Sequence, residues 1–245
     1  MKKSYIIIGV VVVVMLAAIG IYAVINSNSQ SKKKLEENST NIEGKTNTEN
    51  STNENNTENK DENIQNNQIS NESEENNMYS TGKHHAEIVV KNYGTIVLEL
   101  DADVAPITVE NFANLVNEGF YNGLTFHRII SGFMIQGGDP LGNGTGGSSK
   151  TIKGEFASNG VKNSISHVRG TISMARSSMP NSASSQFFIV HQDSTFLDGQ
   201  YAAFGTVTSG MEVVDKICAD TAVEDDNGTV AKNNQPVIEK ITIID

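Results

Sequence analysis

The sequence predicts a mainly β fold for the C-terminal two thirds of the chain, an antiparallel barrel or sandwich whose open ends are covered by two helices. Six to eight short apolar runs follow residue 85, separated by turns rich in Gly, Asn, Ser and Asp. Only two segments show helical spacing, and no regular strand–helix–strand alternation connects the runs. All four Pro and eighteen of the 21 Gly fall in residues 81–245, which is enough chain for one ordinary domain.

The first 25 residues are expected to form a transmembrane anchor. Residues 5–25 contain no charged side chain. As a helix rising about 1.5 Å per residue they reach about 32 Å, which matches a hydrocarbon core of about 30 Å. A secretory signal peptide is the alternative, but its apolar region is usually about 7–15 residues long, and Ala23-Val24-Ile25 offers no small-x-small cleavage site. We therefore expect contact with the lipid bilayer through residues 5–25. The short basic N-terminus favours a domain outside the cytoplasmic membrane, although lysines on the two sides of the segment are nearly balanced in number.

Residues 26–82 are expected to form a disordered linker rich in Asn, Glu, Ser and Thr. Up to residue 80 this stretch holds sixteen Asn, eleven acidic residues, no Pro and one aromatic side chain, Tyr79. So few apolar groups cannot offset the conformational entropy lost on ordering. The domain over residues 83–245 carries eleven Lys plus Arg against eighteen Asp plus Glu. It therefore offers no basic footprint for nucleic acid.

Two strands are expected at the start of the domain, followed by a helix. Residues 86–101 alternate apolar and polar side chains, and Asn92-Tyr93-Gly94 interrupts them with a tight-turn signal. The helix begins at Pro106, which suits a first helical turn, and stops at Gly119. Its apolar face is expected to contain Ile107, Phe112, Leu115 and Val116.

Short strands account for most of the remaining domain. A second helix is expected over residues 211–219, with Cys218 as a small buried apolar group rather than a reactive thiol. The expected strands are residues 125–130, 133–136, 170–175, 186–190, 202–207 and 237–244.

Three familiar kinds of site find little support. Residues 142–147, GNGTGG, fit a dinucleotide-loop pattern, but the β-branched residues after them are poorly suited to open a helix, so a flexible or tightly turning loop is the better interpretation. His127, His167 and His191 lack a carboxylate or Cys at metal-ligand spacing, so they are expected to be structural and no metal is expected. No Ser lies in a G-x-S-x-G elbow, which argues against a hydrolase triad.

Arg128 is the single Arg or Lys among the apolar and glycine-rich residues 121–140. If residues 126–130 form a strand, Arg128 points to the same face as Phe126 and Ile130. Residues 173–190 and residues 195–205 are two further stretches that resemble a site in composition.

Together these three stretches resemble the cyclophilin family of peptidyl-prolyl cis-trans isomerases. The matching motifs are F-H-R-I-I-x-x-F-M-I-Q-G-G-D, then S-M-A-R and S-Q-F-F-I, then F-L-D-G and F-G, in the family's order. The resemblance covers residues 86–245. It implies a closed eight-stranded antiparallel barrel capped by two α-helices, with the substrate groove on its outside and no cofactor.

The resemblance also implies roles for individual residues. Arg128 would be the catalytic donor to the prolyl nitrogen, which becomes pyramidal and gains a lone pair in the twisted transition state. Gln136 would hydrogen-bond the substrate backbone, and Gln186 would position Arg128 or the peptide. Main-chain groups near Ala175 and Arg176 would pair with an extended peptide. The apolar socket for the proline ring would be formed by Phe133, Met134, Phe188 and Leu197, with Phe196 and Tyr201 beside it.

Three positions depart from better-known members of the family, which have Trp at Phe196, His at Tyr201 and Asn at Arg176. Phe196 lacks the indole N–H that cyclosporin-type inhibitors use, so weak cyclosporin binding is expected. Tyr201 keeps an aromatic wall with a polar tip, and Arg176 adds a charge beside the groove.

The sequence therefore predicts a membrane-anchored peptidyl-prolyl cis-trans isomerase that accelerates X–Pro bond rotation during protein folding outside the cytoplasmic membrane. Its partners would be proline-containing peptides and unfolded or exported proteins. The alternative is a proline-peptide binding module or holding chaperone with little turnover, whose groove would bind the cis and trans forms equally. A surface adhesion or scaffold role has no support beyond the long linker.

Overall fold

A long β-hairpin opens the part of the chain that the computed structural model describes, residues 78–245. β1 (Lys83–Val90) and β2 (Gly94–Asp101) pair antiparallel along their whole length. Alternate side chains of both strands are buried, as expected for strands with one covered face. Asn92 turns the chain with φ 67°, a conformation that Asn adopts more readily than most residues.

The expected anchor, residues 1–25, lies outside the described residues, as does the expected linker up to residue 77. No helix within residues 78–245 is long and apolar enough to span a membrane. Tyr79, which the sequence assigns to the linker, packs on the core, and its hydroxyl accepts a hydrogen bond from Asn117 Nδ2 at 3.0 Å. Packing against the domain therefore begins a few residues before β1.

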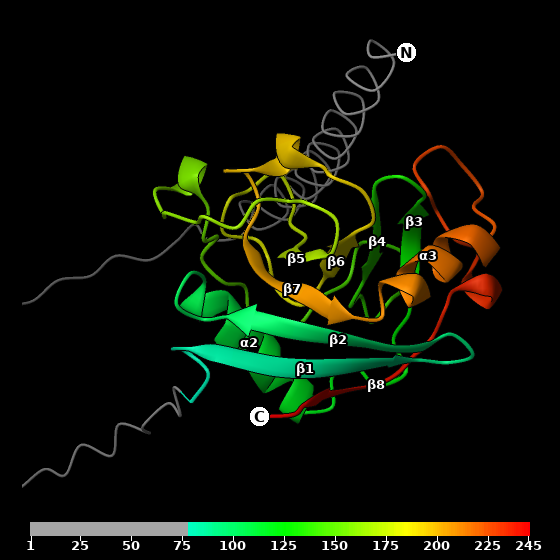
Figure 1. Cartoon of the computed structure of the whole chain (residues 1–245). Coiled ribbons are helices and arrows are strands. Elements are labelled where there is room, and N and C mark those ends of the chain that lie inside the picture. The colour runs from blue at the N-terminus through cyan, green and yellow to red at the C-terminus, as the bar shows by residue number, and fades with distance from the viewer. Residues whose placement is uncertain (1–77) are drawn as a thin grey trace, which may run out of the picture. The chain divides into compact units, whose positions relative to one another are not determined.

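Eight strands form one curled antiparallel sheet in the order β3-β4-β6-β5-β7-β2-β1-β8 (Figure 1). The strand bounds fall within three residues of those that the sequence predicts. Besides the hairpin, the strands are β3 (Phe126–Ile130), β4 (Met134–Gly137), β5 (Thr171–Met174), β6 (Phe187–Val190), β7 (Ala203–Ser209) and β8 (Ile238–Ile243).

The sheet does not close into the continuous barrel that the family resemblance implies. Within the described residues its edge strands, β3 and β8, form no ladder with each other, and the chain joins them just outside their ends through a bridge between Thr125 and Val237. Phe126 N donates to Pro236 O at 2.9 Å. Pro236 has no N–H and cannot return this bond. Beyond Phe126 the edge of β3 pairs instead with residues 228–230, through Ile129 N to Gly228 O at 2.8 Å and Val230 N to His127 O at 3.0 Å, so the seam stays short. The fold is a curled half-barrel rather than a closed barrel.

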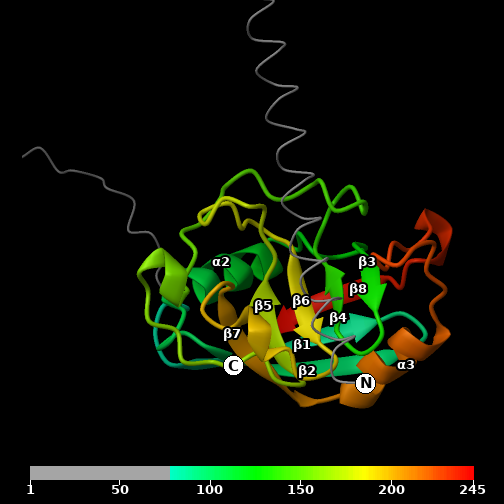
Figure 2. The same cartoon turned by 90° about the horizontal axis from the view of Figure 1, so that it is seen from above.

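Two helices, α2 (Pro106–Asn117) and α3 (Met211–Asp220), lie at opposite ends of the curled sheet (Figures 1 and 2). α2 packs against β2 and β8, and α3 packs against β2. Cys218 on α3 is buried, as predicted, and burial raises the pKa of its thiol to about 12, so it stays protonated at neutral pH.

One residue of the predicted apolar face of α2 is misplaced. Ile107 is 41% exposed, so the prediction that it faces the core is wrong. Thr108 points inward instead, because Glu155 lies buried beneath the first turn and accepts hydrogen bonds from the Ile107 and Thr108 amides at 3.1 and 2.8 Å. A carboxylate at this end of a helix also complements the helix dipole.

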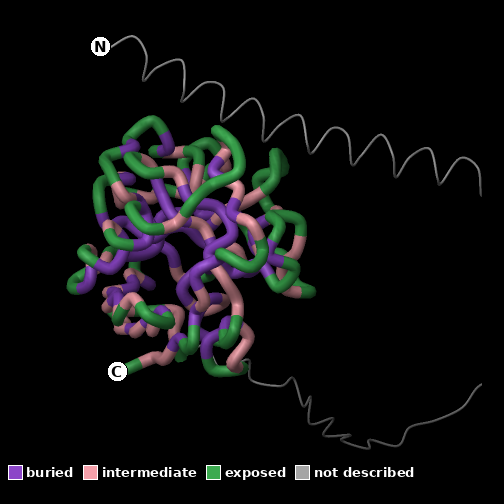
Figure 3. Tube along the Cα trace, turned by 90° about the vertical axis from the view of Figure 1, so that its right-hand side faces the viewer, coloured by how far each residue is buried: buried purple, intermediate pink, exposed green. Residues whose placement is uncertain are grey.

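Buried residues concentrate in the middle of the fold, and exposed residues occupy the peripheral loops (Figure 3). The main core fills the space between the sheet and the helices. A second, smaller cluster is separate from it and consists of Met134, Phe188, Val190 and Leu197, with Ile130, Phe133, Ala175 and Tyr201 packed around them. The second cluster forms the floor of the candidate site.

Candidate functional site

A cleft lies over the second apolar cluster and brings together ten of the residues that the sequence singles out. Gln186 is the one predicted site residue that does not line it. The lining residues are Arg128, Phe133, Met134, Gln136, Ala175, Arg176, Phe188, Phe196, Leu197 and Tyr201.

Arg128 reaches the cleft because β3 contains a β-bulge. In the pairing of β3 with β4 the register shifts between Phe126 and Arg128. Phe126 and Ile129 therefore both enter the main core, whereas Arg128 lines the cleft. The simple alternation that placed Arg128 and Phe126 on one face is wrong for this reason, since a bulge re-aims the side chains of its strand.

The guanidinium of Arg128 is held at three points. Its Nε donates to Asn227 O at 2.8 Å and its Nη2 to Asn227 Oδ1 at 3.1 Å, while Nη1 donates to Gln136 Oε1 at 3.3 Å. A guanidinium carries five N–H donors. One hydrogen on each terminal nitrogen thus makes no hydrogen bond to any residue of 78–245, and the Arg128 side chain is part of the cleft lining.

Gln186 contacts Arg128 only indirectly, through its hydrogen bond with Gln136. Gln136 Nε2 donates to Gln186 Oε1 at 2.9 Å, which fixes the Gln136 amide so that its oxygen faces Arg128. The Gln186 amide nitrogen in turn donates to the carbonyls of Gly144 and Gly146, at 3.1 and 2.7 Å. A polar relay therefore runs from the glycine-rich loop to the guanidinium.

The glycine-rich loop is tightly turned around one carboxylate, and the next helical segment is only a short 3₁₀ turn, Ala157–Asn159. Asp139 is 1% exposed and accepts hydrogen bonds from the backbone amides of Leu141, Asn143 and Gly144. Burial alone would raise the pKa of Asp139, but these hydrogen bonds outweigh burial and hold the pKa below its ordinary value. Gly146 is needed here because a Cβ would lie 2.1 Å from Asp139 Oδ1.

Aromatic side chains form the walls of the apolar socket. Phe133 packs on Phe196 with ring centroids 5.6 Å apart, and Phe188 meets the edge of Tyr201 at 5.9 Å. Phe196 is 47% exposed at the rim of the cleft, whereas Phe188 is buried in its floor. An apolar ring such as that of proline fits a socket of this kind.

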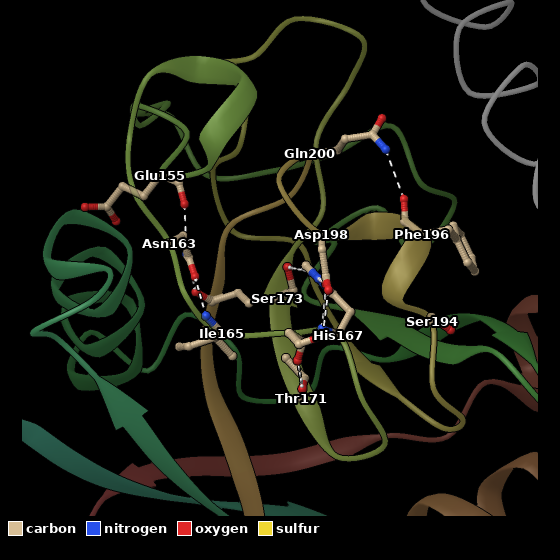
Figure 4. Close-up of polar contacts among 12 residues, drawn as sticks. Glu155, Asn163, Ile165, His167, Thr171, Ser173, Ser194, Phe196, Asp198 and Gln200 are labelled. Carbon is tan, nitrogen blue, oxygen red and sulfur yellow. Dashed lines mark hydrogen bonds and ion pairs between the residues drawn. The ribbon is translucent and has the colours of Figure 1, made fainter.

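A Ser–His–Asp arrangement supports the back of the socket (Figure 4). His167 Nδ1 lies 2.8 Å from Asp198 Oδ1, and Nε2 lies 3.0 Å from Ser173 Oγ. These are the contacts of a hydrolytic triad, but Ser173 is fully buried, so no substrate reaches its hydroxyl. The His167 ring instead stacks on Phe188, with centroids 6.0 Å apart, and holds the floor of the socket in place.

His127, next to Arg128, is buried and its two ring nitrogens find no hydrogen-bond partner among residues 78–245. Burial lowers the pKa of His127 to about 4. The charges of Arg128 and Lys232 add to this effect, and Asp139 opposes it. No group of three His, Cys, Asp or Glu side chains in the described part of the chain is arranged to hold a metal.

His127 should make the domain sensitive to mild acid. An unfolded histidine binds its proton near pH 6.5, whereas the folded His127 does so only near pH 4, so the unfolded state binds more protons between these values. The contribution of His127 to the free energy of unfolding is therefore fully present above about pH 6.5 and should fall by about 3 kcal/mol as the pH drops to 4. Urea unfolding of wild type and His127→Leu at several pH values measures the difference. Ile107→Leu changes an exposed residue without a titratable group and should keep the wild-type pH slope. A His127→Leu slope equal to that of wild type would contradict the prediction.

Two contributors to the site are absent from the sequence predictions. Asn227 supplies two of the three acceptors for Arg128 from 99 positions away in the chain. Phe156 stacks on Arg176, with the guanidinium carbon 5.0 Å from its ring centroid. Asn227-Gly228 was visible as a turn signal, but nothing local connects that turn with β3.

Comparison with known proteins supports one family. The sequence model described as "Cyclophilin type peptidyl-prolyl cis-trans isomerase/CLD" matches residues 85–244. A "Probable peptidyl-prolyl cis-trans isomerase" of Brucella suis biovar 1 (strain 1330) is 46% identical over 158 residues, which are 60% of this chain and 76% of that protein. "Peptidyl-prolyl cis-trans isomerase B" of Bacillus subtilis (strain 168) is 50% identical over 117 residues, 48% of this chain and 78% of that protein.

The fold is similar to that of a solved structure with the same description. A cyclophilin-type peptidyl-prolyl cis-trans isomerase of Cryptosporidium parvum, crystallised in the presence of the dipeptide Ala-Pro, superposes with a TM-score of 0.58 at 32% sequence identity. The match covers 66% of this chain and 99% of that one.

Proposed function

Since the chain belongs to the cyclophilin-type peptidyl-prolyl cis-trans isomerase family and is such an isomerase, we propose that Arg128 catalyses X–Pro bond rotation. We also propose that this activity serves the folding of proteins outside the cytoplasmic membrane. The observation that carries the proposal is the three-point hold on Arg128 in the lining of an apolar cleft, which leaves two of its N–H groups without a partner among residues 78–245.

The barrier to rotation is amide resonance, about 18–20 kcal/mol. As the bond twists, the prolyl nitrogen loses conjugation, becomes pyramidal and gains a lone pair that can accept a hydrogen bond. A planar ground-state imide offers no such acceptor, so a donor aimed at the nitrogen binds the twisted state more strongly than either isomer. Arg128 suits this role because it stays charged and because its partners fix the orientation of its fork.

The substrate on this proposal is a peptide whose proline ring occupies the apolar socket. The ring would contact Phe133, Met134, Phe188 and Leu197, and the peptide backbone would pair with Gln136 and with main-chain groups near Ala175. The Ala-Pro dipeptide named with the Cryptosporidium parvum structure supports a proline peptide as the ligand class.

A proline-peptide binding module with little turnover is the competing function. NMR exchange spectroscopy on a capped Ala-Ala-Pro-Phe peptide separates the two, because it reports the interconversion of cis and trans in the presence of the full chain. Catalytic amounts should accelerate exchange well beyond the spontaneous rate, for which the relaxation time is roughly 10–100 s. Peptide binding without faster exchange, together with protection of a client protein from aggregation that survives Arg128→Ala, would favour the binding module.

The location outside the cytoplasmic membrane rests on the uncharged residues 5–25 and the short basic N-terminus. Protease added to intact cells, followed by detection of the C-terminal domain with an antibody, tests it. Digestion in intact cells is expected, while a domain cut only after the membrane is disrupted would place it inside.

Cyclosporin should bind this protein weakly, and Phe196→Trp should strengthen binding. Phe196 lies exposed at the rim of the cleft, where an indole N–H would add one hydrogen bond to the inhibitor. One such bond is worth about 1 kcal/mol, so we expect a roughly fivefold lower Kd, measured by isothermal titration calorimetry. Phe196→Leu serves as the control that changes the side chain without adding a donor. Equal affinity of the Trp and Leu variants would contradict the prediction.

A further inference from the structure

The three arginines of the chain differ in what neutralises them. Arg169 pairs with Asp215 at 2.8 Å, away from the cleft. Arg128 and Arg176 make no ion pair with any carboxylate of residues 78–245, and their partners are carbonyl and amide oxygens. Both of these arginines line the cleft. The two guanidiniums that lack a counter-charge are thus on the substrate surface.

Arg176 is fixed in place at one end of the cleft. Its guanidinium carbon lies 4.7 Å from the ring centroid of Tyr201 and 5.0 Å from that of Phe156, so it contacts the faces of two aromatic rings. Its Nε and Nη2 both donate to Gln200 O, at 3.0 and 2.8 Å, and Nη1 donates to Ser177 O at 2.9 Å. A guanidinium held in this way cannot turn its charge away from a bound peptide.

Among residues 78–245, no carboxylate lines the cleft to balance these charges. Asp225 is the acidic group whose charge acts on Arg128, but it forms no ion pair with the guanidinium, and its oxygens accept hydrogen bonds from Thr229 N and Oγ1 at 2.9 and 2.8 Å. Asp198, behind the socket, contacts His167 through one carboxylate oxygen and accepts a hydrogen bond from Ser166 Oγ at the other. The cleft is therefore locally cationic, although residues 83–245 carry a net charge of −7.

We infer that Arg176 is a specificity-determining residue which, with Arg128, makes the cleft select proline peptides that carry an acidic side chain close to the proline. The inference rests on the proposed function in one respect, that the peptide occupies this cleft. A unit charge on the peptide, about 8 Å from the guanidinium, changes the binding constant of the peptide by about twofold in a water-like dielectric. In the dielectric of a protein surface the change is about thirtyfold. The hydrogen bonds of Arg176 lie in an exposed part of the fold, which favours the lower part of that range.

The probes are capped peptides Ala-X-Pro-Ala and Ala-Ala-Pro-X, in which X is Glu, Gln or Lys. We expect the full chain, in a non-ionic detergent, to bind the better-placed Glu peptide about fivefold more tightly than its Gln counterpart and about twentyfold more tightly than its Lys counterpart at low salt. At about 1 M salt the Debye length falls to about 3 Å, so the preference should largely disappear.

Two variants separate charge from shape, and a third is the matched control. Arg176→Gln removes the charge and should reduce the Glu-to-Lys ratio to a few-fold, the remainder coming from Arg128. Arg176→Lys keeps a charge without the planar fork and should retain most of the ratio. Arg169→Gln makes the same change of net charge away from the cleft and should leave the ratio as in wild type.

Binding and turnover are measured on the same peptides, so the two proposals fail separately. A Glu-to-Lys ratio of Kd values within twofold in wild type would overturn the inference, as would equal loss of the ratio in Arg176→Gln and Arg169→Gln. Weaker binding of all peptides by Arg176→Gln with an unchanged ratio would also overturn it, because Arg176 would then act only as a structural clamp. Absence of turnover for every peptide, with the ratio intact, would reject the isomerase mechanism and leave the selectivity standing.

Discussion

Replacing Arg128 by alanine is expected to lower kcat/KM for X–Pro isomerisation by about 10²–10³. This is the range found when one preorganised donor to a transition-state acceptor is removed. Arg128 is 8% exposed, so its loss leaves the amide oxygens of Gln136 and Asn227 facing an empty site rather than bringing in another donor. The measurement is a protease-free assay of cis–trans exchange, with kcat and KM determined separately.

The kinetic pattern distinguishes catalysis from binding in this experiment. A donor that acts only in the twisted state should change kcat and leave KM nearly unaltered. Arg128→Lys should recover little of the loss, because an ammonium cannot span Asn227 O, Asn227 Oδ1 and Gln136 Oε1 at once. Arg169→Ala, which removes a surface arginine, is the control. A KM that rises while kcat stays constant would assign Arg128 to peptide binding instead.

Replacing Glu155 by alanine should cause a large loss of stability for the removal of a single charge. Glu155 is 2% exposed, and its carboxylate accepts hydrogen bonds from Ile107 N, Thr108 N and Thr108 Oγ1, the last at 2.6 Å. Its removal leaves buried donors unsatisfied at the start of α2, which we expect to lower the free energy of unfolding by about 3 kcal/mol. For a domain of this size that corresponds to a fall of about 9 °C in Tm.

Calorimetry on two further variants controls for charge and shape. Glu239→Ala removes an exposed carboxylate from β8 and should change Tm by no more than about 1 °C. Glu155→Gln keeps the shape but turns one acceptor into a donor, so it should lie between wild type and Glu155→Ala. Equal Tm values for Glu155→Ala and Glu239→Ala would show that the contacts beneath α2 contribute nothing net.

Local patterns were sufficient to predict the elements of the fold but not the way they join. The hairpin and both helices follow from periodicity and turn residues that lie within a few positions of one another. The seam beside Pro236 depends on two segments more than a hundred residues apart, so no local pattern reveals that closure stops there. The bulge before Arg128 is equally hidden in the sequence, because a prediction from alternating side chains assumes that every residue of the strand pairs with one residue of its neighbour.

The site divides in a similar way. Residues inside the three family motifs were predicted, and ten of them meet around one cleft. Asn227 was not, because its role depends on a turn that docks against β3 through Ile129 N and Gly228 O, 2.8 Å apart. That close approach requires Gly228, where a Cβ would lie 2.3 Å from Ile129 O. Supporting contacts of this kind follow from the packing of distant segments, which a single sequence does not display.

The position of β1 within the sheet has a mechanical consequence. The chain enters the domain through β1, which pairs with β2 along its whole length and with β8 from Ala86 to Val90. A pull on the N-terminal side would load both hydrogen-bonded ladders in parallel, so the strand must break them together rather than one bond at a time. If residues 1–25 anchor the chain as expected, tension would therefore reach the domain at a strand that is paired on both sides rather than at an edge strand.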